Sequence, residues 1–240
     1  MRLIILGSSS TGNGYILTNG RETLIIEAGV SVTKLKKALD FNVSSIEGIL
    51  VSHRHGDHSK YLKDYAKLGA RVFAPEDVLE KIDRQNTIAI QAPMSKVEFG
   101  RFVIVAFAVF HDVPTFGFHV YHPETGNILF LTDTYMCEYT FDNLSHILVE
   151  ANYAEDILDK NMNAGSINKY LRERVWMSHM ELETTKGVLK ANDLGQVRNI
   201  VLIHLSNDNS DEKRFVSEVE QLTARPVYAA APGMELDFTL

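Results

Sequence analysis

Short runs of β-branched and other apolar residues recur along the chain and alternate with segments rich in glycine, serine and asparagine. Runs of about four to eight such residues between turn-forming residues are typical of buried β-strands. The first run is followed by the turn sequence 7–14 and by further apolar runs, which predicts a hairpin-like opening. The pattern predicts strands at 3–6, 15–18, 23–27, 48–52, 71–74, 128–131, 146–150 and 200–203, and a β-rich segment at 97–121.

Other segments repeat their apolar residues every three or four positions, as an amphipathic helix does. Between 32 and 39 such a stripe carries lysines on its other face and follows Ser31, a residue type favoured at helix N-caps. The pattern predicts helices at 32–39, from Asp57 to about 68, and at 75–82, 164–176, 180–191 and 211–222. Periodicity therefore predicts a mixed α and β protein, and no solenoid repeat or low-complexity linker interrupts it.

Length and composition limit the number of domains and the classes of protein that the chain can belong to. The 240 residues, 45% of them hydrophobic and 23% charged, suit one large globular domain, so we predict a single domain over 1–240. No apolar run approaches the ~18 residues of a membrane span. The N-terminal residues lack the cleavage pattern of a signal peptide. We therefore expect a cytoplasmic protein with no membrane partner. The single cysteine, Cys137, excludes an internal disulfide and a Cys-cluster zinc site.

The net charge of −7 argues against a broad nucleic-acid-binding surface, which is usually basic. A polyanionic substrate would have to be held by a local basic patch.

The candidate chemistry is concentrated in His53-Arg54-His55-Gly56-Asp57-His58. Three imidazoles and a carboxylate within six residues offer nitrogen and oxygen donors that suit Zn²⁺, Mn²⁺ or Fe²⁺ better than Ca²⁺ or Mg²⁺. The segment follows the predicted strand 48–52, and side chains two apart in an extended segment point the same way. We therefore expect His53 and His55 to share one direction, and Asp57 and His58, at a helix start, to take another.

This hexapeptide resembles the HxHxDH signature of the metallo-β-lactamase fold. Proteins of that fold carry three later ligands, each at a strand end: a His, a bridging Asp and a terminal His. His111, Asp133 and His204 follow predicted strands in that order.

The resemblance extends over nearly the whole chain to the YycJ (WalJ) type branch, whose members are DNA exonucleases, with RNase Z and PhnP-like phosphodiesterases as relatives. Matching stretches are 7–13, 24–29, 150–152, His179 with the following helix, and 204–209. The segments 111–118, 131–134 and 204–206 resemble the third, fourth and last motifs of the phosphodiesterase branches of the fold. The chain departs from the branch at Glu27, where Asp is usual, at Tyr153, where His is frequent, and at Met180-Glu181, where Leu-Ser is common. These departures leave the ligand positions unchanged but bear on the choice of substrate.

The resemblance implies a fold and a site. The fold is the α/β (α+β) class, as a four-layer αβ/βα metallo-β-lactamase sandwich. The site holds two divalent metal ions, Zn²⁺ or Mn²⁺, one bound by His53, His55 and His111 and the other by Asp57, His58 and His204, with Asp133 bridging them. Two such ions can share a hydroxide and stabilise both attacking and leaving oxygens of a displacement at phosphorus.

Three residues are candidates for catalysis beyond simple metal binding: Asp57, His179 and Glu150. His179 is not needed to complete either metal shell, and a positioned imidazolium can protonate a poor alkoxide leaving group. Glu150, which resembles the glutamate of the phosphodiesterase branch, is the predicted partner of His179. Helix capping by Ser178 or His179 is the structural alternative.

Candidate substrate contacts are Lys169 and Arg172, three apart on a predicted helix, and Ser206 in the last motif. A solvated helix face explains the two cations equally well. The serine-rich turn at 7–14 could offer backbone N–H groups to a phosphate, but a tight hairpin explains it better. His119, His122 and His146 fit no ligand position and are expected to be ordinary strand or turn residues.

These observations predict a metal-dependent phosphodiesterase, and specifically a DNA 5′ exonuclease. A phosphodiesterase for cyclic nucleotides or another small phosphodiester is the first alternative, and the acidic balance favours it slightly. A thioesterase or lactam hydrolase on the same fold is disfavoured by the pair Glu150 and His179, and a non-catalytic binding module by the complete ligand set. The oligomeric state is left open, with a dimer as one alternative.

Overall fold

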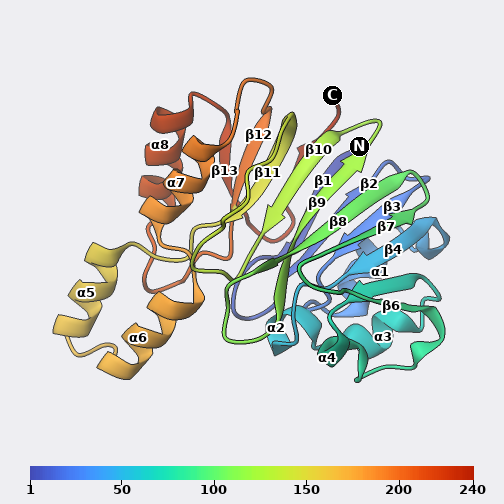
Figure 1. Ribbon diagram of the computed structural model, residues 1–240, viewed down its shortest axis with the longest axis horizontal. Coiled ribbons are helices and arrows are strands. Elements are labelled where there is room, and N and C mark those ends of the chain that lie inside the picture. The colour runs from blue at the N-terminus through green and yellow to red at the C-terminus, as the bar shows by residue number, and fades with distance from the viewer.

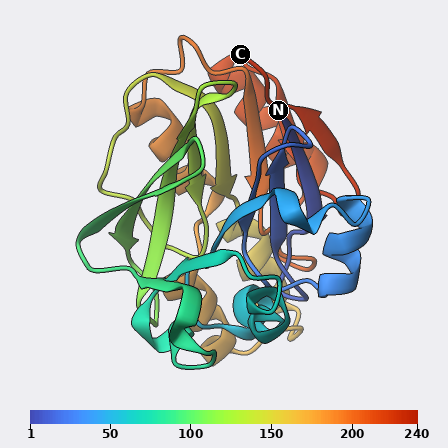
Figure 2. The same cartoon turned by 90° about the vertical axis from the view of Figure 1, so that its right-hand side faces the viewer.

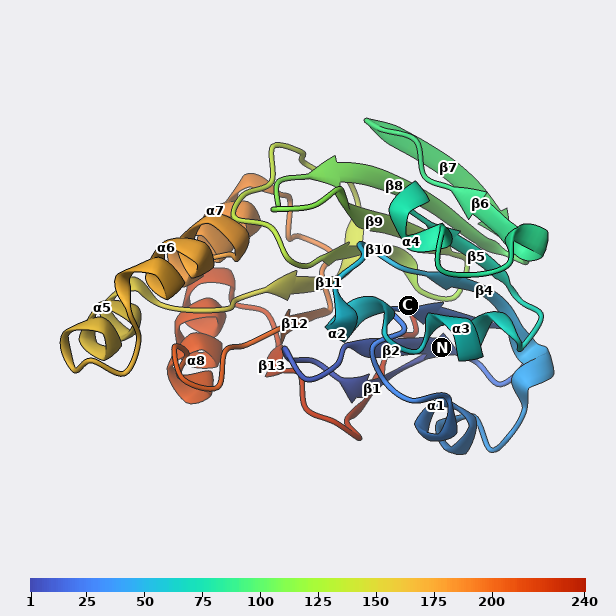
Figure 3. The same cartoon turned by 90° about the horizontal axis from the view of Figure 1, so that it is seen from below.

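The computed structural model describes Met1–Leu240. Two seven-stranded sheets pack face to face, and helices cover their outer faces (Figures 1 and 3). The first sheet has the order β14 (Glu235–Asp237), β1 (Arg2–Gly7), β2 (Gly14–Thr18), β3 (Thr23–Ile26), β4 (Ile46–Leu50), β5 (Arg71–Ala74) and β6 (Thr87–Ala89). The second has the order β13 (Val227–Ala229), β12 (Asn199–Ile203), β11 (Leu144–Glu150), β10 (Gly126–Leu131), β9 (Thr115–His122), β8 (Phe102–Val109) and β7 (Met94–Phe99).

The helices divide between the outer faces and one edge of the sandwich. The helices α1 (Val32–Ala38), α3 (Leu62–Ala66) and α4 (Glu76–Leu79) pack on the first sheet, and α7 (Leu182–Ala191) and α8 (Glu212–Thr223) on the second. The remaining helices are α2 (Gly56–Ser59), α5 (Glu155–Asn163) and α6 (Lys169–Ser178), and short 3-10 turns lie at Val43–Ser45 and Arg84–Asn86. Both α2 and α6 lie along the lower edge of Figure 1, and α5 and α6 project from the body.

The alternation of side chains along each strand produces the layers. In β1, Leu3 and Ile5 belong to the cluster between the two sheets, whereas Ile4 and Leu6 face the helices. This follows because successive side chains of a strand point to opposite faces. The inner cluster joins buried residues of both sheets, and each helical layer has its own cluster with one sheet. The four-layer sandwich predicted from the resemblance is confirmed.

Mixed strand directions bring the ends of key strands to one edge. In the first sheet β3, β4, β5 and β6 are parallel, and in the second β10, β11, β12 and β13 are parallel. The two chain termini lie side by side at the opposite end of the sandwich (Figure 2), where β14 pairs with β1 and the Met1 amine donates to Thr239 Oγ1. The loops after β4, β10 and β12 therefore meet away from the termini.

Several predicted elements differ from those observed. The helix expected from Asp57 to 68 is two short helices, because Tyr61 N donates to the backbone oxygen of Ala28 instead of continuing the helix. The helix expected at 164–176 begins only at Lys169, since Gly165 has a positive φ of 75°. Strands β6, β13 and β14 and helix α5 were not predicted. None of the helices combines the length and the apolar character needed to cross a membrane.

Candidate metal centre

Three imidazoles converge at the end of β4 and β8. His55 Nδ1 lies 3.1 Å from His53 Nε2 and 3.3 Å from His111 Nε2. Nitrogens bound tetrahedrally to Zn²⁺ at ~2.0–2.1 Å are separated by about 3.3 Å, so the observed spacing fits one ion. His111 Nδ1 donates to the Ser178 carbonyl oxygen at 2.8 Å, which leaves the Nε2 lone pair free for a metal.

A second group of donors lies beside the first. Asp57 Oδ2 is 3.2 Å from both His58 Nε2 and His204 Nε2. Asp133 Oδ2 lies 3.0 Å from His58 Nε2 and 3.9 Å from His204 Nε2. Asp133 also groups with His53, whose ligand atom lies within 4.8 Å of those of His58 and Asp133. This position between the two groups is the one that a bridging carboxylate needs.

The local backbone at the site is unusual. Asp133 and His204, which follow β10 and β12, have positive φ values of 48° and 54°, and Glu27 after β3 has 69°. Residues other than glycine rarely adopt this region, and where they do the strain is often associated with function. Here it turns the side chains at three strand ends toward one another.

Residues outside the predicted ligand set support the loop formed by residues 53–58. The Asn13 backbone N–H donates to the Asp57 carbonyl oxygen at 2.7 Å, and its side-chain amide lies 3.2 Å from Asp57 Oδ2. The fully buried Glu27 lies 3.4 Å from His58 Nδ1, an atom with no hydrogen-bond partner. Asn13 is not among the site residues predicted from the sequence, although it lies within the first matching stretch.

The electrostatics of the site favour bound cations. Burial lowers the pKa of His204, but Asp133 and the other carboxylates more than reverse this and raise it to about 10. Burial also lowers the pKa of His58, but the carboxylates of Asp133 and Glu27 raise it well above its ordinary value. Buried carboxylates need compensating positive charge. The excess negative charge around these imidazoles is the charge that divalent ions would neutralise.

His179 and Glu150 form a pair at the rim of this cluster. His179 follows α6, and its Nδ1 lies 2.7 Å from Oε1 of the fully buried Glu150. Burial by itself lowers the pKa of His179, but the Glu150 carboxylate raises it above its ordinary value. Glu150 Oε2 accepts from the backbone N–H groups of Thr134 and Met180. The pair therefore presents a readily protonated imidazole next to Asp133, 3.6 Å away.

A cavity of about 280 Å³ opens over the candidate metal ligands. Its lining consists of Ser10, His55, Gly56, Asp57, His111, Asp112, Asp133, Arg174, Ser178, His179 and His204. Arg174 is exposed and has no ion-pair partner, so its charge is available to an anion in this cavity. Arg174 is not among the residues predicted from the sequence, because only the position of its helix relative to the site distinguishes it from neighbouring cations.

The predicted substrate residues lie elsewhere. Arg172 Nε donates to Asp159 Oδ1 at 2.7 Å and thereby joins α6 to α5, and Lys169 lies 3.7 Å from Glu173. Neither lines the cavity over the ligands. Ser206 lies in a turn, where its backbone N–H donates to the Asn152 carbonyl oxygen, and it lines a separate cavity near the serine-rich loop.

The other histidines have structural surroundings. His146 stacks on Phe238 with ring centres 4.0 Å apart, and His119 stacks on Phe141. His122 lies with Glu22 and Glu124 in a group that could bind a cation. Arg101 already forms hydrogen bonds with both carboxylates, so this group has its own positive charge.

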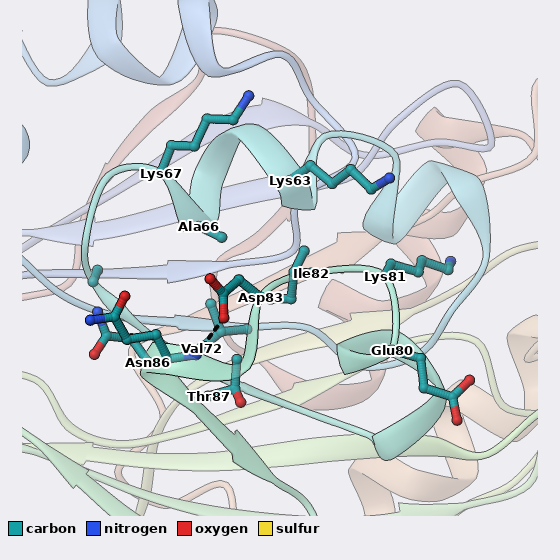
Figure 4. Close-up of a pocket in the computed structure, with 12 residues that line it drawn as sticks. Lys63, Ala66, Lys67, Val72, Glu80, Lys81, Ile82, Asp83, Asn86 and Thr87 are labelled. Carbon is teal, nitrogen blue, oxygen red and sulfur yellow. Dashed lines mark hydrogen bonds between the residues drawn. The ribbon is translucent and has the colours of Figure 1, made fainter.

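A cavity of about 500 Å³ lies apart from the ligands, between α3 and the segment around β6 (Figure 4). Lys63, Lys67 and Lys81 line it together with Glu80 and Asp83. Lys81 Nζ donates to the Arg54 carbonyl oxygen and to Ser59 Oγ, and so supports the loop formed by residues 53–58. No metal-ligand candidate lines this cavity.

Comparison with known families agrees with this fold and donor set. The sequence profile described as the Beta-lactamase superfamily domain matches residues 22–205. The chain belongs to this superfamily, and its fold and donor groups are those of a metal-dependent hydrolase.

Curated relatives and solved structures show where it lies within the superfamily. The chain is 26% identical over 257 aligned positions to exodeoxyribonuclease WalJ of Streptococcus pneumoniae, covering 98% of this chain and 91% of the relative. It is 25% identical to exodeoxyribonuclease YycJ of Bacillus anthracis, covering 98% and 94%. The metallo-beta-lactamase fold protein YhfI of Bacillus subtilis superposes with a TM-score of 0.71 at 16% identity, covering 98% and 99%.

Proposed function

We propose that this protein is a dinuclear metal-dependent phosphodiesterase that acts as a 5′ exonuclease on DNA. The observation that carries the proposal is the unbroken set of donors at one edge, with the pair His179 and Glu150 beside it. The names of the relatives, both exodeoxyribonucleases aligned over 98% of this chain, support DNA as the substrate.

The donor groups suggest how two ions would be held. His53, His55 and His111 would bind one ion, and Asp57, His58 and His204 the other, with Asp133 shared. When bound, such a pair of Zn²⁺ or Mn²⁺ ions lowers the pKa of water and stabilises negative charge on phosphoryl oxygens. Asp57 would contribute to catalysis as a ligand of the second ion, since its Oδ2 lies 3.2 Å from the Nε2 atoms of both His58 and His204.

The protein's own residues account for the remaining steps. The guanidinium of Arg174 can contact a non-bridging phosphate oxygen, because it lines the cavity over the ligands and is unpaired. His179 can donate its Nε2 proton to the departing alkoxide while Glu150 holds the Nδ1 side of the ring. Because His179 and Glu150 can protonate an alkoxide leaving group, they favour a phosphodiester over a thioester or a lactam as the substrate.

A phosphodiesterase for cyclic nucleotides or other small phosphodiesters is the second candidate. The names of the relatives, both exodeoxyribonucleases, favour it less than DNA. We also propose that the protein acts in the cytoplasm, as a single domain over 1–240, and we leave a dimer as an open alternative for its assembly.

Two assays test the proposal in sequence. Hydrolysis of bis-p-nitrophenyl phosphate but not of a thioester by the Zn²⁺- or Mn²⁺-loaded protein would support a phosphodiesterase. Linear DNA with a label at one end and a blocked 5′ or 3′ terminus would then be compared with cyclic nucleotides. Release of mononucleotides that stops when the 5′ end is blocked is expected, and hydrolysis of cyclic nucleotides alone would favour the second candidate.

A further inference from the structure

A second cavity, of about 440 Å³, opens on the other side of His179. Its lining consists of Tyr135, Tyr153, Glu155, Trp176, Met177, His179, Glu181 and Thr184. Its volume lies within the range of small-molecule sites. His179 lines both this cavity and the cavity over the metal ligands. A group bound here would therefore be next to the atoms that react.

The cavity presents large apolar side chains to solvent. Trp176, Met177 and Tyr135 are 58%, 62% and 39% exposed, and the ring of Phe110 lies 5.5 Å from that of Tyr135. Each is close to a site residue in sequence: Phe110 precedes His111, Tyr135 follows Asp133 by two positions, and Trp176 precedes His179 by three. Exposed aromatic side chains gathered at one site usually mark a binding surface.

The two sides of His179 differ in whether a cationic side chain is present. Glu155 and Glu181 contribute carboxylates to the aromatic cavity, and Lys and Arg are absent from its lining. On the other side, the cavity over the candidate metal ligands contains Arg174 together with the carboxylates of Asp57, Asp112 and Asp133. Carboxylates repel a phosphate but accept hydrogen bonds from the N–H groups of a nucleobase. The aromatic cavity thus suits the base of a nucleotide, and the metal side suits its phosphate.

We propose that this aromatic cavity binds the unpaired nucleobase next to the scissile phosphate, with Trp176 and Tyr135 as stacking surfaces. The inference rests on the proposed phosphodiesterase function and adds to it a contact with the base of the substrate. A base within a duplex is paired and stacked, so it can enter the cavity only after it is freed. Stacking on aromatic rings holds bases without strong sequence preference.

The first test uses the fluorescence of Trp176, the single tryptophan of the chain. The metal-loaded protein is titrated with deoxyadenosine 5′-phosphate and, as the base-free probe, with deoxyribose 5-phosphate. We expect saturable quenching by the nucleotide and little change with the sugar phosphate. Equal responses to both probes, or none to either, would overturn the inference, because both carry the same phosphate.

The second test measures hydrolysis of a single-stranded oligonucleotide and of the same oligonucleotide with abasic terminal residues. The unmodified protein should prefer the intact end. Trp176→Ala should lower that preference by about 5- to 100-fold, the effect of losing one base stack, and Trp176→Phe should retain most of it. Tyr170→Ala is the matched control, because Tyr170 is an 80% exposed aromatic residue of α6 that does not line the cavity.

The outcomes separate this inference from the proposed function. A metal-loaded protein that cleaves no phosphodiester would refute the function, whereas the fluorescence titration would still report on base binding. Cleavage of oligonucleotides with equal preference for intact and abasic ends in the unmodified protein would refute the base site alone. A Trp176→Ala protein with unchanged preference but a smaller mass in light scattering would assign the aromatic face to contact with a second copy.

Discussion

His179 Nδ1 lies 2.7 Å from Glu150 Oε1, and the same oxygen lies 3.4 Å from His204 Nδ1. One buried carboxylate thus contacts both the candidate proton donor and a candidate metal ligand. Its second oxygen is held by backbone N–H groups of Thr134 and Met180. This arrangement links the two functions, since a change in Glu150 affects both the imidazole of His179 and the candidate ligand His204.

Replacing His179 by alanine should abolish most turnover while two ions remain bound. Loss of a positioned proton donor typically costs ~10²- to 10⁴-fold in rate. Steady-state kinetics on a phosphodiester and elemental analysis of the same samples measure both quantities. His119→Ala is the control, because His119 stacks on Phe141 away from the ligands. Activity within a few-fold of the unmodified protein would contradict the role, and loss of an ion would make His179 a ligand.

Glu150→Gln should show a smaller loss of turnover in the same direction. The amide keeps the shape of the side chain and one acceptor oxygen, but it removes the charge that raises the pKa of His179. Because Glu150 also lies near His204, metal affinity should be measured in parallel, and a decrease of ~10- to 100-fold is the usual effect of removing such a support. A loss of turnover larger than that of His179→Ala would show that support of the ligand is the main role.

Asp133→Ala should disturb binding of both ions, since Asp133 is the only ligand assigned to two coordination shells. Elemental analysis should give two ions per chain for the unmodified protein and fewer than two for this variant. His122→Ala is the matched control, because its group contains the same ligand types but already has Arg101. A variant that retains two ions, or a metal-replete protein that binds only one, would refute the bridging assignment.

Arg174→Ala should weaken DNA binding and reduce the dependence of affinity on salt. Loss of one phosphate contact lowers the slope of log affinity against log salt by about one. The double variant Lys169→Ala with Arg172→Ala, which removes the two cations predicted from the sequence as substrate contacts, is the comparison. Arg172 is paired with Asp159, so we expect this variant to change the slope less than Arg174→Ala. A larger change in the salt slope for the double variant than for Arg174→Ala would indicate that Lys169 and Arg172 contact the DNA.

His146 should make folding stability sensitive to acid. Burial lowers the pKa of this fully buried imidazole to about 4, whereas it is about 6.5 in an unfolded chain. Between these values the unfolded state binds more protons, so stability falls as pH falls. From pH 7.5 to 5 the unmodified protein should lose ~2 kcal/mol relative to His146→Leu. Urea unfolding of both proteins at matched metal content measures the difference, and parallel pH dependences would contradict it.

The sequence by itself determined the strands that precede the donors and the positions of the donors at their ends. The apolar runs before His53, Asp133 and His204 are local signals, because a strand buried on both faces must be apolar at nearly every position. The spacing of the hexapeptide is local as well. Together with the resemblance, these signals were sufficient for the four-layer fold.

Only the tertiary structure decided which side chains outside the motifs reach the site. Arg174 and Arg172 are two residues apart on one polar helix, and only the packing of α6 beside the ligands shows that Arg174 is free and Arg172 is bound to α5. Helix α5 is polar, and it is held by contacts distant in sequence, among them the 2.7 Å ion pair of Asp156 with Arg214. Strand β14 forms only by pairing with β1, more than 200 residues away. Such elements are stabilised by residues that are distant in the sequence. A local sequence pattern therefore cannot predict their positions.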